Sequence, residues 1–412
     1  MNIDKQYPCV AYMEAAAKRR IPRFVRDYLF HGIGEGASVQ KNRDALNGVE
    51  LMPRYLKEAD RPDLHCHFLG REYSAPFGVA PMGLSGLVWP NSERVLAAAA
   101  KVHNIPYTLS TVATVSLEEI RTIAGDNAWF QLYTPQEEEV RVDLLRRCQE
   151  AGYETIMVTV DVPFKTRRDH DIRNGLSVPP RFDAHTLWQM VTHPNWALRM
   201  ARHSLTGGVP QFVNLKPYHD AGQSRNVGRA IRESTKFIEE RMGLHITTER
   251  FKGLRDRWPG KLLVKGVLDP DEAKAYMALG ADGVIVSNHG GRQLDAAPSA
   301  VEVLPAIRAA VGADTPIIAD GGVRSGLDIA RMLALGADFV IMGRPFLFAL
   351  GAMDRVGGEH VMNILKAELQ STLGQLGCAS LAELPSTLHV PQTGSSVHLN
   401  GTVSAHFQPR HV

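Results

Sequence analysis

The chain has 412 residues, of which 44% are hydrophobic and 22% charged, and its formal net charge at pH 7 is +2. These values are typical of a soluble globular protein and argue against a nucleic-acid partner. The length suits one large barrel domain with insertions.

The sequence carries no sign of a membrane span or of export. It has no run of eighteen or more apolar residues, and the first ten residues carry Asp4 and Lys5 where a signal peptide would have an apolar core. The four cysteines lie far apart without metal-ligand spacing, as expected of thiols in a reducing compartment: Cys9, Cys66, Cys148 and Cys378. We therefore expect a cytoplasmic protein, soluble or peripheral on the inner face of the cell membrane.

The N-terminal segment, residues 1–60, is predicted to be helical. Apolar spacing indicates helices from Tyr12 to Lys18 and from Pro22 to Phe30, with Pro22 acceptable in a first helical turn. Alternate glycines then mark a break, at Gly32, Gly34 and Gly36.

From residue 77 a rhythm of apolar run, loop and helix repeats eight times. The apolar runs are Phe77–Met82, Tyr107–Ser110, Trp129–Tyr133, Thr155–Asp161, Leu262–Val267, Gly283–Asn288, Pro316–Gly321 and Phe339–Arg344. The clearest helical patterns between and after them are Ser92–Val102, Gln136–Ala151, Asp269–Leu279, Pro298–Val311 and Ser325–Leu335. Eight apolar strands that alternate with helices predict a (β/α)₈ TIM barrel, forming a single domain over residues 1–389.

The rhythm breaks once, after the fourth predicted strand. About a hundred residues separate Asp161 from Leu262, which is far more than one loop and helix require. We interpret residues 165–245 as an insertion, which carries Trp188 and Trp196 among scattered cations. An ordinary long active-site loop is one interpretation, and a lid, an oligomer contact or a membrane-surface segment is the other. The tail, residues 390–412, is expected to be irregular.

Polar residues stand at or near the end of nearly every predicted strand, where a (β/α)₈ barrel has its active site. In strand order the strand-end residues are Ala80, Pro81 and Met82; Ser110; Gln131 and Tyr133; Thr159 and Asp161; Lys265; Ser287 and His289; Asp320, Gly321 and Gly322; and Gly343. Lys265 is the sharpest case, because an ammonium among apolar neighbours requires an anionic partner. A structural ion pair with Asp161 or Asp320 is the alternative to a role in catalysis.

Glycines and arginines follow the last two strands. Gly321, Gly322 and Arg324 come after the seventh strand, and Gly343 and Arg344 after the eighth. In this architecture that position, with free backbone N–H groups at a helix N-terminus, binds phosphate. The pattern predicts a phosphorylated cofactor or substrate, and ordinary glycine turns with surface arginines are the alternative.

The most specific motif follows the sixth strand and reads Ser-Asn-His-Gly-Gly-Arg-Gln-Leu-Asp, residues 287–295. Alone it could be a tight turn with polar decoration. Together with Asp-Gly-Gly-Val-Arg (320–324) and Gly-Arg (343–344), it resembles the FMN-dependent α-hydroxy-acid oxidase and dehydrogenase family. That family includes glycolate oxidase, respiratory L-lactate dehydrogenase and mandelate dehydrogenase. The resemblance runs from about Tyr12 to Leu384.

The resemblance implies a role for each strand-end residue. His289 would take a proton from the substrate and Asp161 would hold and stabilise it, while Tyr133 would contact the substrate hydroxyl. Arg292, Arg168 and Tyr28 would bind the substrate carboxylate. The isoalloxazine ring would be held by Ala80, Ser110, Gln131, Thr159 and Ser287, with Lys265 at its carbonyl edge. The phosphate would be held by Gly322, Arg324, Gly343 and Arg344. Four further residues would bind the cofactor: Pro81, Met82, Asp320 and Gly321.

The resemblance also implies an FMN-dependent oxidation of an L-2-hydroxy acid to the 2-oxo acid, and a homotetramer. Gly83 stands where glycolate oxidase has alanine, and Val112 replaces a bulky tryptophan, so we expect a lactate-like or larger substrate and a dehydrogenase that reduces quinone or another acceptor. An oxidase that reduces oxygen to hydrogen peroxide is the alternative. A type 2 isopentenyl diphosphate isomerase would share the phosphate site but would not need His289 with Arg292, and a non-catalytic metabolite-binding barrel would not need Lys265.

Overall fold

The computed structural model describes residues 2–57, 61–164, 166–174, 184–207, 211–218 and 245–389, together with Phe237 and Arg241. The predicted tail, residues 390–412, and parts of the predicted insertion lie outside the described residues.

Eight parallel strands close into a barrel in the order β10-β3-β4-β5-β6-β7-β8-β9. The strands are β3 (Phe77–Val79), β4 (Tyr107–Ser110), β5 (Ala128–Leu132), β6 (Thr155–Thr159), β7 (Lys261–Val267), β8 (Gly283–Val286), β9 (Ile317–Ala319) and β10 (Phe339–Met342). Each is buried along most of its length because helices cover the barrel from outside and side chains fill it from inside. The predicted (β/α)₈ barrel is confirmed. Most predicted strands ran too far at their C-terminal ends, because the polar residues there turn away from the sheet into the loops.

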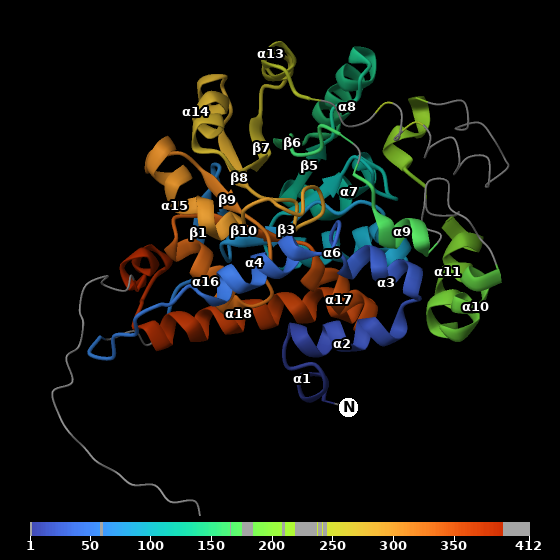
Figure 1. Cartoon of the computed structure of the whole chain (residues 1–412), viewed down its shortest axis with the longest axis horizontal. Coiled ribbons are helices and arrows are strands. Elements are labelled where there is room, and N and C mark those ends of the chain that lie inside the picture. Colours follow the sequence, from blue (N-terminus) through green and yellow to red (C-terminus); the bar gives the residue numbers. More distant parts are fainter. Residues whose placement is uncertain are drawn as a thin grey trace, which may run out of the picture.

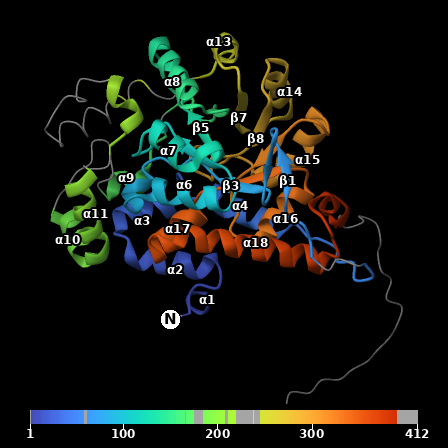
Figure 2. The same cartoon turned by 180° about the vertical axis from the view of Figure 1, so that it is seen from behind.

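Helices follow each strand in the chain and surround the barrel (Figures 1 and 2). They are α5 (Ser85–Val88), α6 (Ser92–Val102), α7 (Leu117–Ala124) with η1 (Gly125–Asn127), α8 (Glu138–Ala151), α13 (Thr248–Arg257), α14 (Pro270–Ala278), α15 (Ala300–Val311), α16 (Gly326–Ala334), α17 (Arg344–Met353), α18 (Val356–Leu376) and η4 (Leu381–Thr387). Several begin at side-chain caps; Ser299 and Glu302, for example, form a reciprocal capping box at the start of α15.

A short hairpin closes one end of the barrel. Its strands, β1 (Cys66–Phe68) and β2 (Arg71–Tyr73), are antiparallel. The Phe68 ring stacks on Phe339 with centroids 4.8 Å apart, and Tyr73 meets the same ring edge-on at 5.7 Å. Phe339 is the first residue of β10, so the hairpin covers the N-terminal end of the strands. The C-terminal end is thereby left for the site.

Four helices precede the hairpin: α1 (Ile3–Gln6), α2 (Val10–Arg20), α3 (Arg23–Phe30) and α4 (Ala37–Asn47). The sequence predicts Pro22 in the first turn of this helix. In the structure Pro22 has extended backbone and lies one residue before the first residue of α3. Apolar spacing does not predict α4, because two of the three residues that this helix buries, Ser38 and Asn42, are polar and leave no apolar period.

The insertion contains α9 (Asp169–Arg173), α10 (Ala184–Thr192), α11 (Pro194–Gly207) and η2 (Val213–Tyr218) within the described part. Figures 1 and 2 show α10 and α11 at one side of the molecule, next to α3. The Phe24 backbone N–H donates to Gln189 Oε1 at 2.9 Å, and the Phe24 ring meets Trp196 edge-on at 5.7 Å. In the part of the chain that the structure describes, no helix has the length and apolar character needed to cross a membrane.

Candidate active site

The imidazole of His289 lies between a carboxylate and a phenol. Its Nδ1 is 2.9 Å from Asp161 Oδ1, and its Nε2 is 3.4 Å from the Tyr133 hydroxyl. The backbone of His289 is left-handed, with φ of 56°, and its N–H donates to Ser287 Oγ at 3.0 Å. This unusual turn directly after β8 aims the ring across the end of the barrel, toward residues of β5 and β6. The arrangement suits a base whose Nδ1 is held and whose Nε2 is free to take a proton.

Asp161 is a buried carboxylate held next to a glycine. Burial raises its pKa, but the attraction of His289, the hydrogen bond with it and the charge of Lys265 outweigh burial, so the pKa lies below the ordinary value. Gly266 has φ of 106°, and a Cβ there would stand 2.4 Å from Asp161 Cγ. The β7–β8 register shifts at this point, between Lys265 and Val267. The glycine in β7 therefore makes the room that the carboxylate occupies.

Lys265 is buried in β7 and contacts two other strand ends. Its Nζ donates to Ser287 Oγ at 2.9 Å and lies 3.0 Å from Asp320 Oδ2. Burial lowers its pKa, but Asp320 and then Asp161 outweigh burial and raise the pKa above the ordinary value. The ammonium is therefore charged at neutral pH. The ion pair with Asp320, which was the alternative interpretation of this lysine, is present, while the buried Oδ1 of Asp320 has no hydrogen-bond partner among the described residues.

Three polar side chains form a chain of hydrogen bonds across β4, β5 and β6. The Ser110 hydroxyl donates to Gln131 Oε1 at 2.8 Å, and Gln131 Nε2 donates to Thr159 Oγ1 at 2.8 Å. All three are buried, and each comes from the last residues of its strand. On the other side, the Ala80 N–H donates to the carbonyl of Met342 at 2.9 Å, and Pro81 and Met82 continue the chain from there. The strand ends thus offer a rim of hydrogen-bonding groups around a flat ligand.

Two arginines, Arg292 and Arg168, and Tyr28 lie near Tyr133. The Arg292 guanidinium lies 4.7 Å from the centre of the Tyr28 ring, and its Nη1 donates to the Tyr28 carbonyl at 2.6 Å. Burial and then the charge of Arg168 lower the pKa of Arg292. No carboxylate in the described residues lies within ion-pair distance of Arg292, and Arg168 reaches only Asp171, at 3.9 Å. Two cations with so little neutralisation suit an anionic ligand such as a carboxylate.

The surroundings of Arg324 and Arg344 show whether a phosphate fits after β9 and β10. Burial is the main cause that lowers the pKa of Arg324 to about 10 and the pKa of Arg344 well below its ordinary value. Within the described ranges neither guanidinium has a carboxylate at ion-pair distance, and the buried Nη2 of Arg344 has no hydrogen-bond partner. Gly321 and Gly322 both have left-handed φ, of 106° and 82°. Two partly buried guanidinium groups without a carboxylate partner in the described chain, beside glycines with left-handed backbone, fit the phosphate of FMN.

Sequence reasoning missed the contribution of α4 to the loop of residues 287–295. The side-chain amides of Asn42 and Asn288 exchange two hydrogen bonds, of 2.9 and 2.8 Å. Asn288 Oδ1 also accepts from the Gly291 N–H at 3.2 Å, and the Ser38 N–H donates to Asp295 Oδ1 at 2.9 Å. The polar residues that hid α4 from prediction are the ones that fix this loop. A helical spacing of buried polar residues would have been the signal.

Gly83 and Val112 lie together beside Tyr28. A Cβ on Gly83 would stand 2.7 Å from Val112 Cγ2 and 3.8 Å from the Tyr28 hydroxyl, which donates to the Gly83 carbonyl at 2.9 Å. Gly83, which the sequence linked to a dehydrogenase, and Val112, which it linked to substrate size, therefore both lie beside Tyr28. A larger side chain at either one would push against the other.

Known proteins resemble this chain in sequence and in fold. The model of the FMN-dependent dehydrogenase family matches residues 17–390. The chain is 35% identical to (S)-mandelate dehydrogenase of Pseudomonas putida over 367 residues, which are 89% of this chain and 90% of that protein. It is 35% identical to L-lactate dehydrogenase of Ectopseudomonas mendocina (strain ymp) over 378 residues, 92% of this chain and 97% of that protein. The crystal structure of a monotopic membrane protein, (S)-mandelate dehydrogenase, superposes with a TM-score of 0.85 at 36% identity, and covers 92% of this chain and 98% of that one.

Proposed function

Since this chain belongs to the FMN-dependent dehydrogenase family, and is thereby an FMN-dependent enzyme that acts on hydroxy acids, we propose that it oxidises an L-2-hydroxy acid, lactate-like or larger, to the 2-oxo acid. We propose further that the electrons pass to quinone or another carrier. The observation that carries the proposal is the Asp161–His289–Tyr133 alignment, with the Arg292–Tyr28 pair near Tyr133.

The oxidation removes two electrons and two protons from the substrate. FMN, when bound, would supply the acceptor for the two electrons and for one of the two protons. His289 receives one proton at Nε2, the nitrogen that faces away from Asp161. Asp161 then stabilises the imidazolium, and because its own pKa is depressed it stays ionised through this step. Tyr133 contacts the substrate hydroxyl from the other side of Nε2.

The substrate carboxylate is bound by Arg292 with Arg168 and the Tyr28 hydroxyl. Arg292 is fixed by its contacts with the ring and carbonyl of Tyr28, so it presents a planar fork in one orientation. This orients the hydroxyl-bearing carbon toward His289. A substrate held in one reactive orientation reacts faster in the chemical step.

The remaining residues hold the cofactor. Arg324, Arg344 and the glycines after β9 and β10 bind the phosphate, and the rim of strand ends holds the isoalloxazine ring. Lys265, charged and buried, places a positive charge where the ring gains negative charge on reduction. The Asp320 partner keeps that ammonium in place when the site is empty.

Val112 supports a substrate larger than glycolate, because the resemblance places it where glycolate oxidase has a bulky tryptophan. Gly83, which stands where glycolate oxidase has alanine, supports a dehydrogenase, and both residues lie beside Tyr28. The relatives include a mandelate and a lactate dehydrogenase, so the panel of candidate substrates runs from lactate to aromatic 2-hydroxy acids.

We also propose peripheral contact with a membrane through α10 and α11. Five apolar side chains of these helices are exposed: Leu187, Trp188, Val191, Leu198 and Leu205. The opposite face buries Thr186, Gln189 and Trp196 against the rest of the protein. Apolar residues that face solvent on two adjacent helices are typical of a binding surface. A membrane is the natural source of a quinone acceptor. The homotetramer implied by the family resemblance stays a prediction, which sedimentation velocity tests.

Anaerobic flavin reduction tests the proposal. The purified yellow protein is mixed without oxygen with L-lactate, L-mandelate, longer L-2-hydroxy acids and the D-enantiomer of each. We expect the oxidised flavin absorbance to bleach with at least one L-acid and not with its D-enantiomer. A flavin that no acid of the panel bleaches would contradict the proposed substrate class. Reoxidation of the bleached protein by a soluble quinone, but only slowly by oxygen, would support a dehydrogenase, and rapid reoxidation by oxygen an oxidase.

A further inference from the structure

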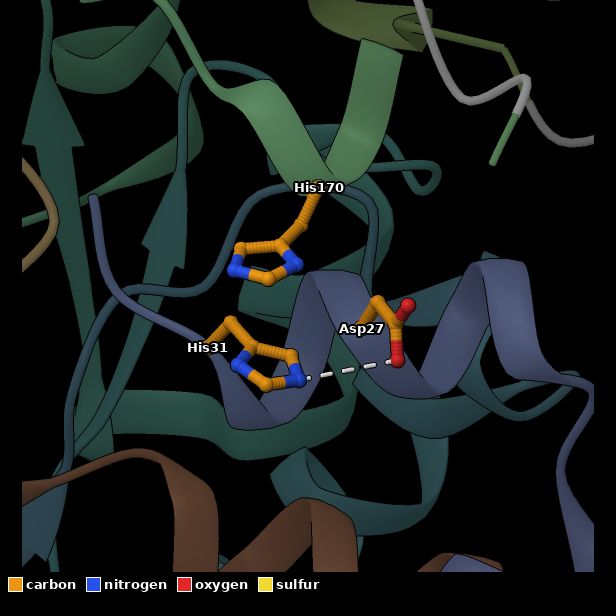
Figure 3. Close-up of side chains that lie close together, drawn as sticks. All are labelled: Asp27, His31 and His170. Atoms are coloured by element: carbon orange, nitrogen blue, oxygen red, sulfur yellow. Dashed lines mark ion pairs between the residues drawn. The ribbon is translucent and has the colours of Figure 1, made fainter. Parts of the chain in front are cut away.

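Three potential metal ligands converge where the insertion meets the N-terminal segment (Figure 3). Asp27 and His31 come from α3 and its end, and His170 comes from α9. One ligand atom from each lies within 4.8 Å of the other two. Across the part of the chain that the structure describes, this is the one group of three His, Cys, Asp or Glu side chains with that property.

The geometry of the two elements brings the ligands together. Asp27 and His31 are four residues apart and therefore share one face of the helical turn. The His31 and His170 rings stack with centroids 4.2 Å apart and planes inclined by 13°. Figure 3 shows both rings between α3 and α9, with the Asp27 carboxylate beside the His31 ring. One nitrogen of each ring lies within 4.8 Å of an oxygen of the Asp27 carboxylate.

The Asp27 carboxylate has one oxygen committed and one available. Its Oδ2 accepts a hydrogen bond from Asn174 Nδ2. Its Oδ1 is 3.7 Å from His31 Nε2 and 3.7 Å from Arg26 Nε, and both distances are longer than a hydrogen bond. Asp27 is buried while His31 is about half exposed, with 48% of its side chain accessible, so an ion can reach the group from solvent.

We propose that Asp27, His31 and His170 bind a divalent ion of the zinc type, with water in a fourth position. Two imidazole nitrogens and one carboxylate oxygen are ligands that Zn²⁺ prefers, whereas Mg²⁺ and Ca²⁺ require mainly oxygen. Ligands around a zinc ion stand closer together than 4.8 Å, and the nitrogen lone pairs of two stacked rings do not point at one ion. The side chains therefore draw in and at least one ring turns out of the stack when the ion binds. The nearby cations Arg23 and Arg26 oppose binding, which favours a moderate affinity.

The ion would tie the insertion to the helix beneath it. Tyr28 directly follows Asp27, and Arg168 lies two residues before His170. Both are carboxylate-binding residues of the proposed function, so this consequence rests on that proposal, whereas the metal site does not. A bound ion would restrain the segment that carries Arg168 against the helix that carries Tyr28.

Calorimetric titration of the flavin-loaded enzyme with Zn²⁺ tests the site. The protein is first dialysed against a chelator, and no substrate is present, so the result does not depend on the hydroxy-acid activity. We expect one saturable ion per chain, and we expect His31→Ala and His170→Ala each to weaken its binding by at least about tenfold. The control His67→Ala removes an exposed histidine of β1, outside the group, and should bind as the wild type does.

Hydrogen exchange provides a second measurement. With Zn²⁺, amides of α9 and of the end of α3 should exchange more slowly in the wild type but not in His170→Ala. The flavin absorbance of each variant verifies that it is folded. The site is refuted if the wild type binds no ion below about 100 μM, or if both histidine variants bind it as tightly as the wild type.

Discussion

At the scale of one residue, His289 combines a ring nitrogen that Asp161 holds with a strained, left-handed backbone. Asp161 takes Nδ1, the left-handed turn aims the ring, and Nε2 faces Tyr133. Only a side chain that accepts a proton can use this arrangement.

We expect His289→Gln to retain FMN and to lose flavin reduction by roughly 10²–10⁴-fold, because an amide cannot take up the proton. Anaerobic stopped-flow absorbance with the best L-2-hydroxy acid measures the rate, and the visible spectrum of the resting protein reports FMN occupancy. Reduction at a near-normal rate would rule out His289 as the base.

Arg292 depends on the shape of its guanidinium as well as on its charge. We expect Arg292→Lys to raise the substrate dissociation constant by about 10–100-fold. An ammonium cannot form a two-pronged contact with a carboxylate, and it cannot replace the guanidinium over the Tyr28 ring. The dependence of the flavin reduction rate on substrate concentration gives this constant. An unchanged constant would mean that the carboxylate binds elsewhere.

At the scale of elements, α4 is a brace for the catalytic loop. Asn42→Ala would leave the buried Asn288 amide without two hydrogen bonds. We expect the free energy of unfolding to fall by about 1–3 kcal/mol and kcat to fall more than KM changes, because the loop of His289 loses its support. Thermal unfolding and steady-state kinetics measure the two effects.

The control for this brace lies on the same helix. Gln40 is exposed and bonds only to Asp44 within the described residues, at 2.8 Å. Gln40→Ala should therefore change neither quantity. Equal effects of the two substitutions would show that α4 acts through general stability and not through the loop.

The exposed apolar face of α10 and α11 predicts binding to a membrane surface. We expect the wild type to sediment weakly with anionic vesicles, and the double variant Trp188→Ser with Leu198→Ser to stay in the supernatant, because it loses apolar area from the exposed face. Val102→Ser removes an equally exposed apolar residue from α6 and serves as the control. Sedimentation of the double variant at the wild-type level would place any membrane contact elsewhere.

At the scale of the whole molecule, the cofactor is part of the fold. Arg324 and Arg344 are partly buried, have no carboxylate at ion-pair distance in the described chain, and come from two adjacent strand ends. In the proposed cofactor site a phosphate between them would pair with both, so FMN would stabilise the barrel end as well as supply chemistry.

Removal of FMN should lower Tm by a few degrees, since a ligand at a hundred times its dissociation constant contributes about 2.7 kcal/mol. Adding FMN back should restore Tm, while riboflavin, which has the ring but no phosphate, should restore much less. Scanning calorimetry of the three forms makes the comparison. Equal stabilisation by riboflavin would show that the two arginines are not the phosphate site.

The sequence by itself determined the barrel, the family and the cofactor. Parallel strands buried on both faces leave continuous apolar runs, and the ends of such strands meet at one edge, so polar residues there identify a site before any coordinates exist. Lys265, His289 and Arg344 could be singled out because each breaks an apolar run or follows one directly.

Only the tertiary structure decided what depends on contacts between segments far apart in the chain. Asn42 and Asn288, Gly266 and Asp161, and His31 and His170 are pairs of this kind. The outward apolar face of α10 and α11 is another case, because an amphipathic pattern does not tell which side faces the protein. Periodicity records the local environment of a residue, whereas the identity of its distant neighbour is set by how the whole chain packs.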